Sequence, residues 1–244
     1  MSDMLVDLST KPWFRQAVKS LGLPLPTPQK LRRPKSPWVE RPLQDRAVII
    51  GAAQGGALDA TLADILPQAG ADPHLVGVDA INKAWLAAGE AYGRPPVLHP
   101  AGDAPEGVRA HALVFDATAA RDADDLRALY DFFHPWLGRL GSNGRVLVFG
   151  RPPADQKNAD VAGAQAALEG FVRSLAKEIG RKGATAHVVY VSEGAEAHLA
   201  PVARFLLSER SAFLTGQPWH VSAKVAAAGG RPVRPLEGRT VLVT

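Results

Sequence analysis

A glycine-rich turn is the segment of this chain with the clearest potential for chemistry. Residues 47–50 form an apolar run, and Gly51, Gly55 and Gly56 follow it, before an apolar pattern of helical spacing. Glycines at such a strand-to-helix turn permit unusual backbone angles and let a phosphate approach the amides at the helix N-terminus. Asp79 follows the second expected strand, where a carboxylate can bind the ribose hydroxyls of a dinucleotide. The pattern predicts a nucleotide site or, as the alternative, a plain turn with Asp79 as a surface acid or helix cap.

Other kinds of catalytic site find little support. The chain has no cysteine, which excludes disulfides, thiolate metal ligands and thiol nucleophiles. None of its seven histidines pairs at the i,i+4 spacing that a metal site on one helix needs. The sequence contains neither a Gly-x-Ser-x-Gly nucleophile turn nor a phosphate loop with Gly-Lys-Ser/Thr. We therefore expect no metal site.

The order of apolar patterns predicts the fold that positions the glycine turn. Uniformly apolar runs of strand length alternate with longer runs of helical spacing, and strands apolar on both faces are typical of a parallel sheet covered by helices. We predict a doubly wound, Rossmann-like α/β fold with three layers, helices on both sides of the sheet. The expected strands are 47–51, 74–78, 112–116, 145–149, 186–191 and 219–221, and the expected helices are 57–68, 123–140, 161–181 and 199–208. A further strand at 96–99 has only a weak signal.

Composition and charge separate an N-terminal arm from the body. The chain has 244 residues, 46% of them hydrophobic, and a net charge of +4, which suits one domain with appendages. Residues 1–40 combine a short amphipathic helix ending near Leu21 with a basic, proline-rich segment that favours extended chain. We expect a linker laid over the body with its charges solvated and, because it lacks interleaved aromatic residues, no nucleic-acid binding. No leader pattern or membrane-length apolar stretch is present, so we expect a cytoplasmic protein without membrane association.

Motifs between residues 41 and 222 resemble those of the short-chain dehydrogenase/reductase family. IIGAAQGGAL at 49–58 stands where the family has a Thr-Gly-x-x-x-Gly-x-Gly loop, and ALVFDAT at 112–118 stands where it has a strand ending in Asn-Asn-Ala-Gly. GRVLVFG at 144–150 is similar to the strand that leads to the catalytic serine. AALEGFVRSLAKEIGRKGATAHVVYV at 166–191 resembles the helix and strand after Tyr-x-x-x-Lys, and FLLSERSAFLTGQPWHV at 205–221 resembles the C-terminal segment.

The resemblance also implies that the family's catalytic groups are lost. It puts Val161 at the tyrosine position, Gln165 at the lysine position and Arg151 at the serine position. Reduction of a carbonyl by this family needs a phenol that a neighbouring ammonium makes acidic, which valine and glutamine cannot replace. Tyr190 lies on an expected buried strand, where a packed, hydrogen-bonded side chain is typical. We expect no catalytic residue and no bound cofactor in this chain, and a vestigial cofactor site at Gly51, Gly55, Gly56 and Asp79.

A near-repeat suggests how the chain is organised. Residues 234–244, RPLEGRTVLVT, nearly repeat residues 41–51, RPLQDRAVIIG. We expect a degenerate Rossmann-like domain at 41–223, and at 224–244 a linker with the first strand of a second, related domain outside this chain. This arrangement resembles the N-terminal half of the high-molecular-weight 3-oxoacyl-[acyl-carrier-protein] reductases. The resemblance implies a non-catalytic domain joined to a C-terminal reductase domain that reduces 3-oxoacyl thioesters with NAD(P)H in fatty acid biosynthesis.

The same resemblance suggests the partners. They are the chain's own C-terminal reductase domain, a second copy in a homodimer, and an acyl carrier protein attracted by the basic arm. The role would be assembly or carrier docking. The alternative is a free-standing, dinucleotide-binding protein of the short-chain dehydrogenase/reductase type.

Overall fold

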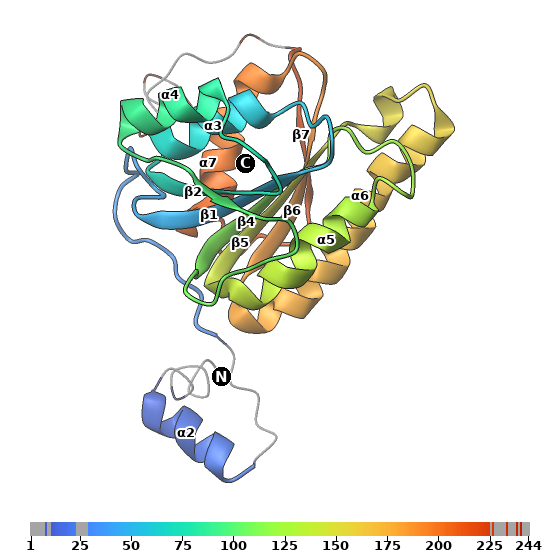
Figure 1. Cartoon of the computed structure of the whole chain (residues 1–244). Helices are drawn as coiled ribbons and strands as arrows, with labels where there is room; N and C mark the ends of the chain where they lie inside the picture. The colour runs from blue at the N-terminus through green and yellow to red at the C-terminus, as the bar shows by residue number, and fades with distance from the viewer. Residues whose placement is uncertain are drawn as a thin grey trace.

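A seven-stranded parallel sheet forms the centre of the molecule (Figure 1). The structure is a computed structural model, and it describes residues 8, 11–22, 29–224, 226, 233, 238 and 240. The strand order is β3-β2-β1-β4-β5-β6-β7, and every neighbouring pair is parallel. The strands are β1 (Arg46–Ala52), β2 (Ala71–Val76), β3 (Val97–His99), β4 (Ala110–Asp116), β5 (Leu140–Gly150), β6 (Thr185–Val191) and β7 (Pro218–Val221). The predicted doubly wound sheet is confirmed, including the weakly signalled strand near residue 97.

Helices cover both faces of this sheet and enclose two hydrophobic cores. Helices α3 (Asp59–Gln68), α4 (Lys83–Tyr92) and α7 (Leu199–Leu207) contribute to one core, and α5 (Arg127–Trp136) and α6 (Ala159–Ile179) contribute to the other. Neighbouring residues of a strand face opposite cores: Val48 and Ile50 belong to the first, Ile49 to the second. Burial on both faces explains why these strands are apolar throughout.

The bounds of three predicted elements are wrong by three residues or more, and one of these elements is β5, which begins at Leu140 rather than 145. Strand β2 begins at Ala71 rather than 74 and ends at Val76 rather than 78. Pro73 is tolerated inside it because the pairing of β2 with β3 begins only at His74. The helix expected at 123–140 is the shorter α5, which runs only from Arg127 to Trp136 and is followed by a 3-10 turn. At the end of the predicted helix, residues 137–139 form this turn and Leu140 begins β5.

Helix α4 lies in a region for which the sequence predicted no helix. Its first turn is capped by Asn82, whose Oδ1 accepts hydrogen bonds from the amides of Ala84 and Trp85 at 3.0 and 3.2 Å. It ends at Gly93, whose φ of 65° is the left-handed conformation that closes many helices. Trp85 then anchors α4, because its indole Nε1 donates to Asp59 Oδ1 at 2.8 Å at the start of α3.

The N-terminal region consists of a helix and an arm. Helix α2 (Pro12–Ser20) agrees with the predicted short helix, and it lies apart from the sheet domain in Figure 1. The arm at 29–40 lies against the amino-terminal edge of the sheet rather than free in solvent. Asn143 Oδ1 accepts the amide of Arg32 at 3.0 Å, and Arg210 donates to Ser36 O at 2.6 Å and covers the ring of Trp38 at 4.6 Å.

The predicted first strand of a second domain falls almost wholly outside the described residues, which include only Gly238 and Thr240 of that segment. The boundaries proposed at residues 40 and 223 therefore stay predictions. None of the helices in the described ranges is long and apolar enough to cross a membrane.

Candidate functional site

The glycine turn lies between β1 and α3, at the carboxyl-terminal edge of the sheet. Each of its glycines has a local structural cause. A Cβ atom on Gly51 would lie 2.3 Å from the ring of Phe132, and one on Gly56 would lie 2.6 Å from the carboxylate of Asp116. Gly55 has a φ of +86°, which side chains rarely adopt. The glycine spacing is therefore explained by packing and backbone shape without any bound phosphate.

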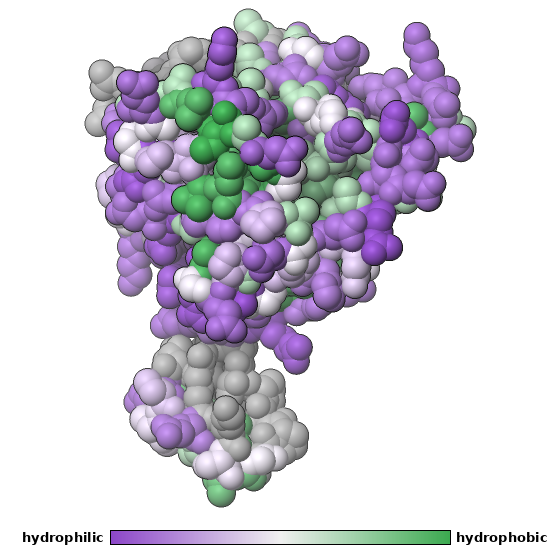
Figure 2. All heavy atoms as spheres, in the orientation of Figure 1, coloured by the Kyte–Doolittle hydropathy of each residue, from purple (hydrophilic) through white to green (hydrophobic). Residues whose placement is uncertain are grey.

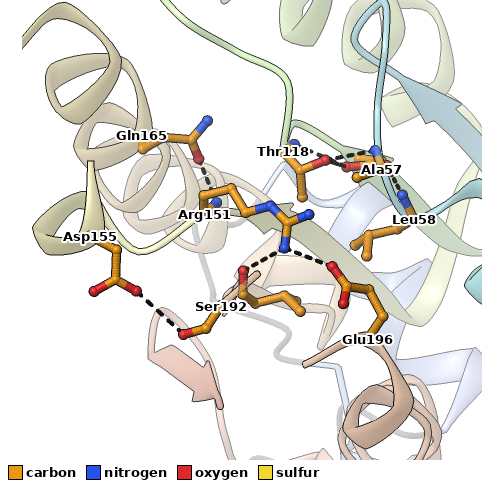
Figure 3. Close-up of polar contacts among 10 residues, drawn as sticks. Ala57, Leu58, Thr118, Arg151, Asp155, Gln165, Ser192 and Glu196 are labelled. Carbon is orange, nitrogen blue, oxygen red and sulfur yellow. Dashed lines mark hydrogen bonds and ion pairs between the residues drawn. The ribbon is translucent and has the colours of Figure 1, made fainter. Parts of the chain in front are cut away.

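Asp116 and Thr118 occupy the start of helix α3, where Figure 3 shows Thr118 beside Ala57 and Leu58. The amide of Leu58 donates to Asp116 Oδ2 at 2.8 Å, and the amide of Ala57 donates to Thr118 Oγ1 at 2.9 Å. Thr118 donates its own amide and hydroxyl to Asp116 Oδ1, at 2.9 and 2.6 Å. Asp116 is only 2% exposed. A buried carboxylate and a hydroxyl thus cap the helix end that a phosphate would use.

This arrangement does not fit a dinucleotide pyrophosphate. A phosphate at the start of α3 would have to replace two hydrogen bonds from amides and would meet the charge of Asp116 at close range. Asp79 lies exposed in the loop after β2, and no hydrogen bond or ion pair within the described ranges involves it. Its proposed contact with a ribose therefore stays a prediction.

Gln165, at the position of the family's lysine, is a structural residue in this chain. It is fully buried on α6. Its Oε1 accepts the amide of Arg151 at 2.7 Å (Figure 3). Its Nε2 donates to the carbonyls of Ala117 and Ala120 at 3.0 and 2.8 Å. Val161 lies one turn earlier and is half-buried. Gln165 therefore joins α6 to the loops after β4 and β5.

Arg151, at the position of the serine, extends across the edge of the sheet. Its guanidinium donates to the carbonyl of Val191 at 3.0 Å and to Glu196 Oε1 at 2.9 Å (Figure 3). Burial opposes ionisation of Glu196, but hydrogen bonds from its own backbone amide and from Arg151 lower its pKa. Nearby, Ser192 Oγ donates to Asp155 Oδ2 at 3.4 Å. The ion pair between Arg151 and Glu196 holds the end of β5 to the loop after β6.

Tyr190 does not replace the missing phenol. It lies buried on β6, and its hydroxyl donates to the carbonyl of Gln165 at 3.1 Å. Burial raises the pKa of Tyr190 to about 12, whereas proton transfer near neutral pH needs a lower value. The expectation of a packed, hydrogen-bonded tyrosine agrees with the structure. The described positions 151, 161, 165 and 190 thus provide no proton donor suited to carbonyl reduction.

The roles of Asp116, Thr118 and Glu196 were not predicted from the sequence. A signal for Asp116 was present, because this acid ends a buried apolar strand. Its position beside the glycine turn follows from the strand order, since β4 pairs with β1 and Ala52 lies opposite Asp116. The distant segment around Glu196 carries no such local signal.

No group of three or more metal-binding side chains occurs among the residues that the structure describes. A cavity of about 770 Å³ lies between α5 and α6, away from the glycine turn. Apolar side chains, including Leu129, Phe133, Phe171 and Leu175, line it.

Comparison with known proteins identifies the fold. No family model matches the chain, and no curated protein matches it. A short-chain dehydrogenase from Escherichia coli CFT073 has a TM-score of 0.62 at 16% identity, over 77% of this chain and 99% of that protein. A short-chain dehydrogenase from Salmonella enterica serovar Typhi CT18 has a TM-score of 0.60 at 15% identity, over 78% of this chain and 99% of that protein. A dehydrogenase/reductase from Sinorhizobium meliloti 1021 has a TM-score of 0.58 at 18% identity, over 75% of this chain and 96% of that protein. The chain therefore has the Rossmann-like fold of the short-chain dehydrogenases/reductases.

Proposed function

We propose that this chain is a non-catalytic domain of reductase origin that works beside a 3-oxoacyl-[acyl-carrier-protein] reductase domain. The residues at the carboxyl-terminal edge of the sheet support this proposal. There Val161, Gln165 and Arg151 offer no proton donor, and Asp116 occupies the start of α3. The motifs and the near-repeat resemble the N-terminal half of the high-molecular-weight reductases. In this proposal the partner domain binds NAD(P)H and reduces the 3-oxoacyl thioester.

The role left to the domain is assembly or carrier docking. Two apolar surfaces are available for packing: the cavity between α5 and α6, and the edge formed by β3 and α4. Figure 2 shows apolar side chains gathered over the α3–α4 side of an otherwise mainly hydrophilic face. At the β3–α4 edge, the exposed apolar side chains are Val78, Leu86, Val97 and Leu98. The basic arm would attract an acidic carrier protein.

A second candidate is a dinucleotide-binding protein of the short-chain dehydrogenase/reductase type. The observation that favours it is the extent of the structural match, because the chain covers 96–99% of the dehydrogenases compared above. Gly55 also keeps the backbone conformation of a tight strand-to-helix turn, and Asp79 is exposed beyond β2. If this second function is correct, the cofactor would bind after Asp116 and Thr118 release the amides of Leu58 and Ala57.

Cofactor titration separates the two candidates. NADH and NADPH are titrated into the chain while their fluorescence and the unfolding temperature of the protein are measured. If the chain is a non-catalytic domain, we expect millimolar cofactor to change neither the fluorescence nor the unfolding temperature. We also expect no oxidation of NADPH when a 3-oxoacyl thioester is added. Saturable binding that Asp79→Ala weakens would support the second candidate and contradict the first.

The coding frame provides an independent test of the proposed partner domain. A frame that continues beyond Thr244 into a Gly-x-x-x-Gly-x-Gly turn, a serine and Tyr-x-x-x-Lys would support the tandem arrangement. A stop codon directly after Thr244 would contradict it.

A further inference from the structure

A polar cavity lies at the amino-terminal edge of the sheet, opposite the glycine turn. Its volume is about 340 Å³. Arg32 of the arm, Arg46 at the start of β1, Arg109 just before β4 and Asn143 on β5 line it. We propose that this cavity binds the phosphate group of a phosphomonoester. The proposal is independent of the proposed function, since it uses none of the residues at the carboxyl-terminal edge.

The charges around the cavity favour an anion. Three arginines line it together with two carboxylates, Asp45 and Glu209. Arg94 does not line the cavity; its Nη1 lies 2.7 Å from Asp45 Oδ1 and also 2.7 Å from Asp72 Oδ1, so it offsets the charge of Asp45 in part. Glu209 Oε1 lies 3.7 Å from Arg46 Nη2 and offsets that guanidinium. The other two arginines have no ion-pair partner in the described part of the chain, so they leave positive charge for a ligand.

Asn143 supplies a buried donor without an acceptor. Its side chain is 98% buried, since the residue is only 2% exposed, and its Oδ1 accepts the amide of Arg32. Its Nδ2 has no hydrogen-bond partner within the described residues. Leaving a buried donor unpaired is costly, so such groups usually mark a bound water or ligand. Asn143 lines the cavity, but this nitrogen has almost no accessible surface, so an oxyanion would have to displace the atoms that cover it to accept the hydrogen bond.

His111 is a buried imidazole at the same place. It lines the cavity, and its Nε2 lies 3.0 Å from Leu207 O. Burial is the main cause that lowers the pKa of His111 to about 4; Arg46 and Arg145 lower it further, whereas the hydrogen bond to Leu207 and the charge of Glu209 raise it. A neutral imidazole adds no charge to the cavity, so the arginines alone supply the attraction for an anion.

The surroundings favour a phosphomonoester over a simple carboxylate. A dianionic phosphate presents several oxygens to guanidinium forks and balances more than one arginine. A second cavity of about 190 Å³ shares Arg46, His111 and Glu209 with the first. Pro37, Trp38 and Val39 line it, so it offers an apolar surface to the organic part of the ligand.

Calorimetric titration of the whole chain at low ionic strength tests the proposal. The probes are inorganic phosphate and glycerol phosphate, with sodium chloride at matched ionic strength as the blank. We expect one phosphate per chain. Arg109→Ala should weaken binding about tenfold, as expected for loss of one charge-assisted hydrogen bond. Arg127→Ala is the matched control, because Arg127 is an exposed arginine on α5, and it should leave binding unchanged.

Asn143→Asp tests the buried donor more directly. The aspartate keeps an oxygen for the amide of Arg32 and tolerates the left-handed backbone, where φ is 57°, but it replaces the Nδ2 donor with an acceptor. Phosphate binding should be lost while the circular dichroism spectrum is unchanged. If this variant fails to fold, Arg109→Ala decides, since Arg109 is exposed.

Three results would overturn the proposal. They are no saturable heat with either phosphate probe, equal binding by the parent chain and Arg109→Ala, and an equal loss in the Arg127→Ala control. Tighter binding of glycerol phosphate than of inorganic phosphate supports a phosphomonoester, whereas clearly weaker binding overturns that choice of ligand.

Discussion

Replacing Asp116 with alanine should destabilise the domain, because two buried amides lose their acceptor. The amides of Leu58 and Thr118 both donate to this carboxylate, at 2.8 and 2.9 Å. Each buried donor left unpaired costs about 1–3 kcal/mol, and the favourable position of the charge at a helix start is lost as well. Release of a buried carboxylate offsets part of this cost. We expect Asp116→Ala to lower the free energy of unfolding by about 2–4 kcal/mol.

Urea unfolding followed by circular dichroism measures this loss, provided that the m-value is unchanged. Asp160→Ala is the matched control, because Asp160 is an exposed acid in the first turn of α6. It should cost about 0.3–1 kcal/mol at most. Thr118→Val removes part of the same cap. The double variant should therefore lose less unfolding free energy than the sum of the losses in the two single variants. An Asp116→Ala variant as stable as the Asp160→Ala control would refute the cap and reopen the start of α3 to a phosphate.

Three further predictions concern packing, the buried amide and pH. Gly51→Ala should lower the free energy of unfolding by about 1–3 kcal/mol, because the added methyl group would clash with Phe132. Phe132→Leu in the same chain should recover part of the lost stability. If urea unfolding shows no recovery, this contact is excluded as the cause. Gln165→Leu should cost about 2–4 kcal/mol, because one buried amide and two carbonyls lose their partner. Gln165→Glu keeps the Oε1 acceptor but can donate to a carbonyl only when it is protonated, so its stability relative to Gln165→Leu should rise from pH 7 to pH 5; no rise in urea unfolding would contradict this role. His74 Nδ1 lies 2.7 Å from His99 Nε2; burial and the neighbouring His99 lower the pKa of His74, and burial lowers that of His99. Both rings therefore bind protons less readily in the folded state than in the unfolded state, and the stability that they contribute should be lost as pH falls below the ordinary value of 6.5. The difference in unfolding free energy between pH 7.5 and 5 should be smaller for His99→Phe, and an unchanged difference would exclude the pair as its source.

The sheet was predictable from the sequence because burial on both faces leaves a direct record in the residues. Strands β1, β4, β5 and β6 are apolar on consecutive positions, which few other environments require. Helix α4 was missed because most of its residues are small or weakly periodic. Only its two ends carry clear signals, the cap Asn82 and the left-handed Gly93, and both are local features that are easily taken for a loop.

The residues at the candidate site were harder to predict, because their roles depend on contacts between distant segments. Gln165 was identified only as a replaced lysine. Its three hydrogen bonds depend on loops after β4 and β5, and no pattern within α6 encodes them. Asn143 at the other edge carries no motif at all, and its importance rests on a backbone contact with the arm and one unpaired donor.

The two edges of the sheet differ in how far their polar groups are satisfied, and this difference indicates where a ligand binds. At the carboxyl-terminal edge, Asp116, Gln165 and Arg151 all bond to other parts of the chain, so a cofactor there would have to break existing contacts. At the amino-terminal edge, Asn143 keeps a buried donor without an acceptor, beside an excess of arginine. A ligand gains most where it completes hydrogen bonds that the protein has left open. In this chain the fold of a dinucleotide-binding protein is retained, but the edge best prepared for an anion is the one opposite the glycine turn.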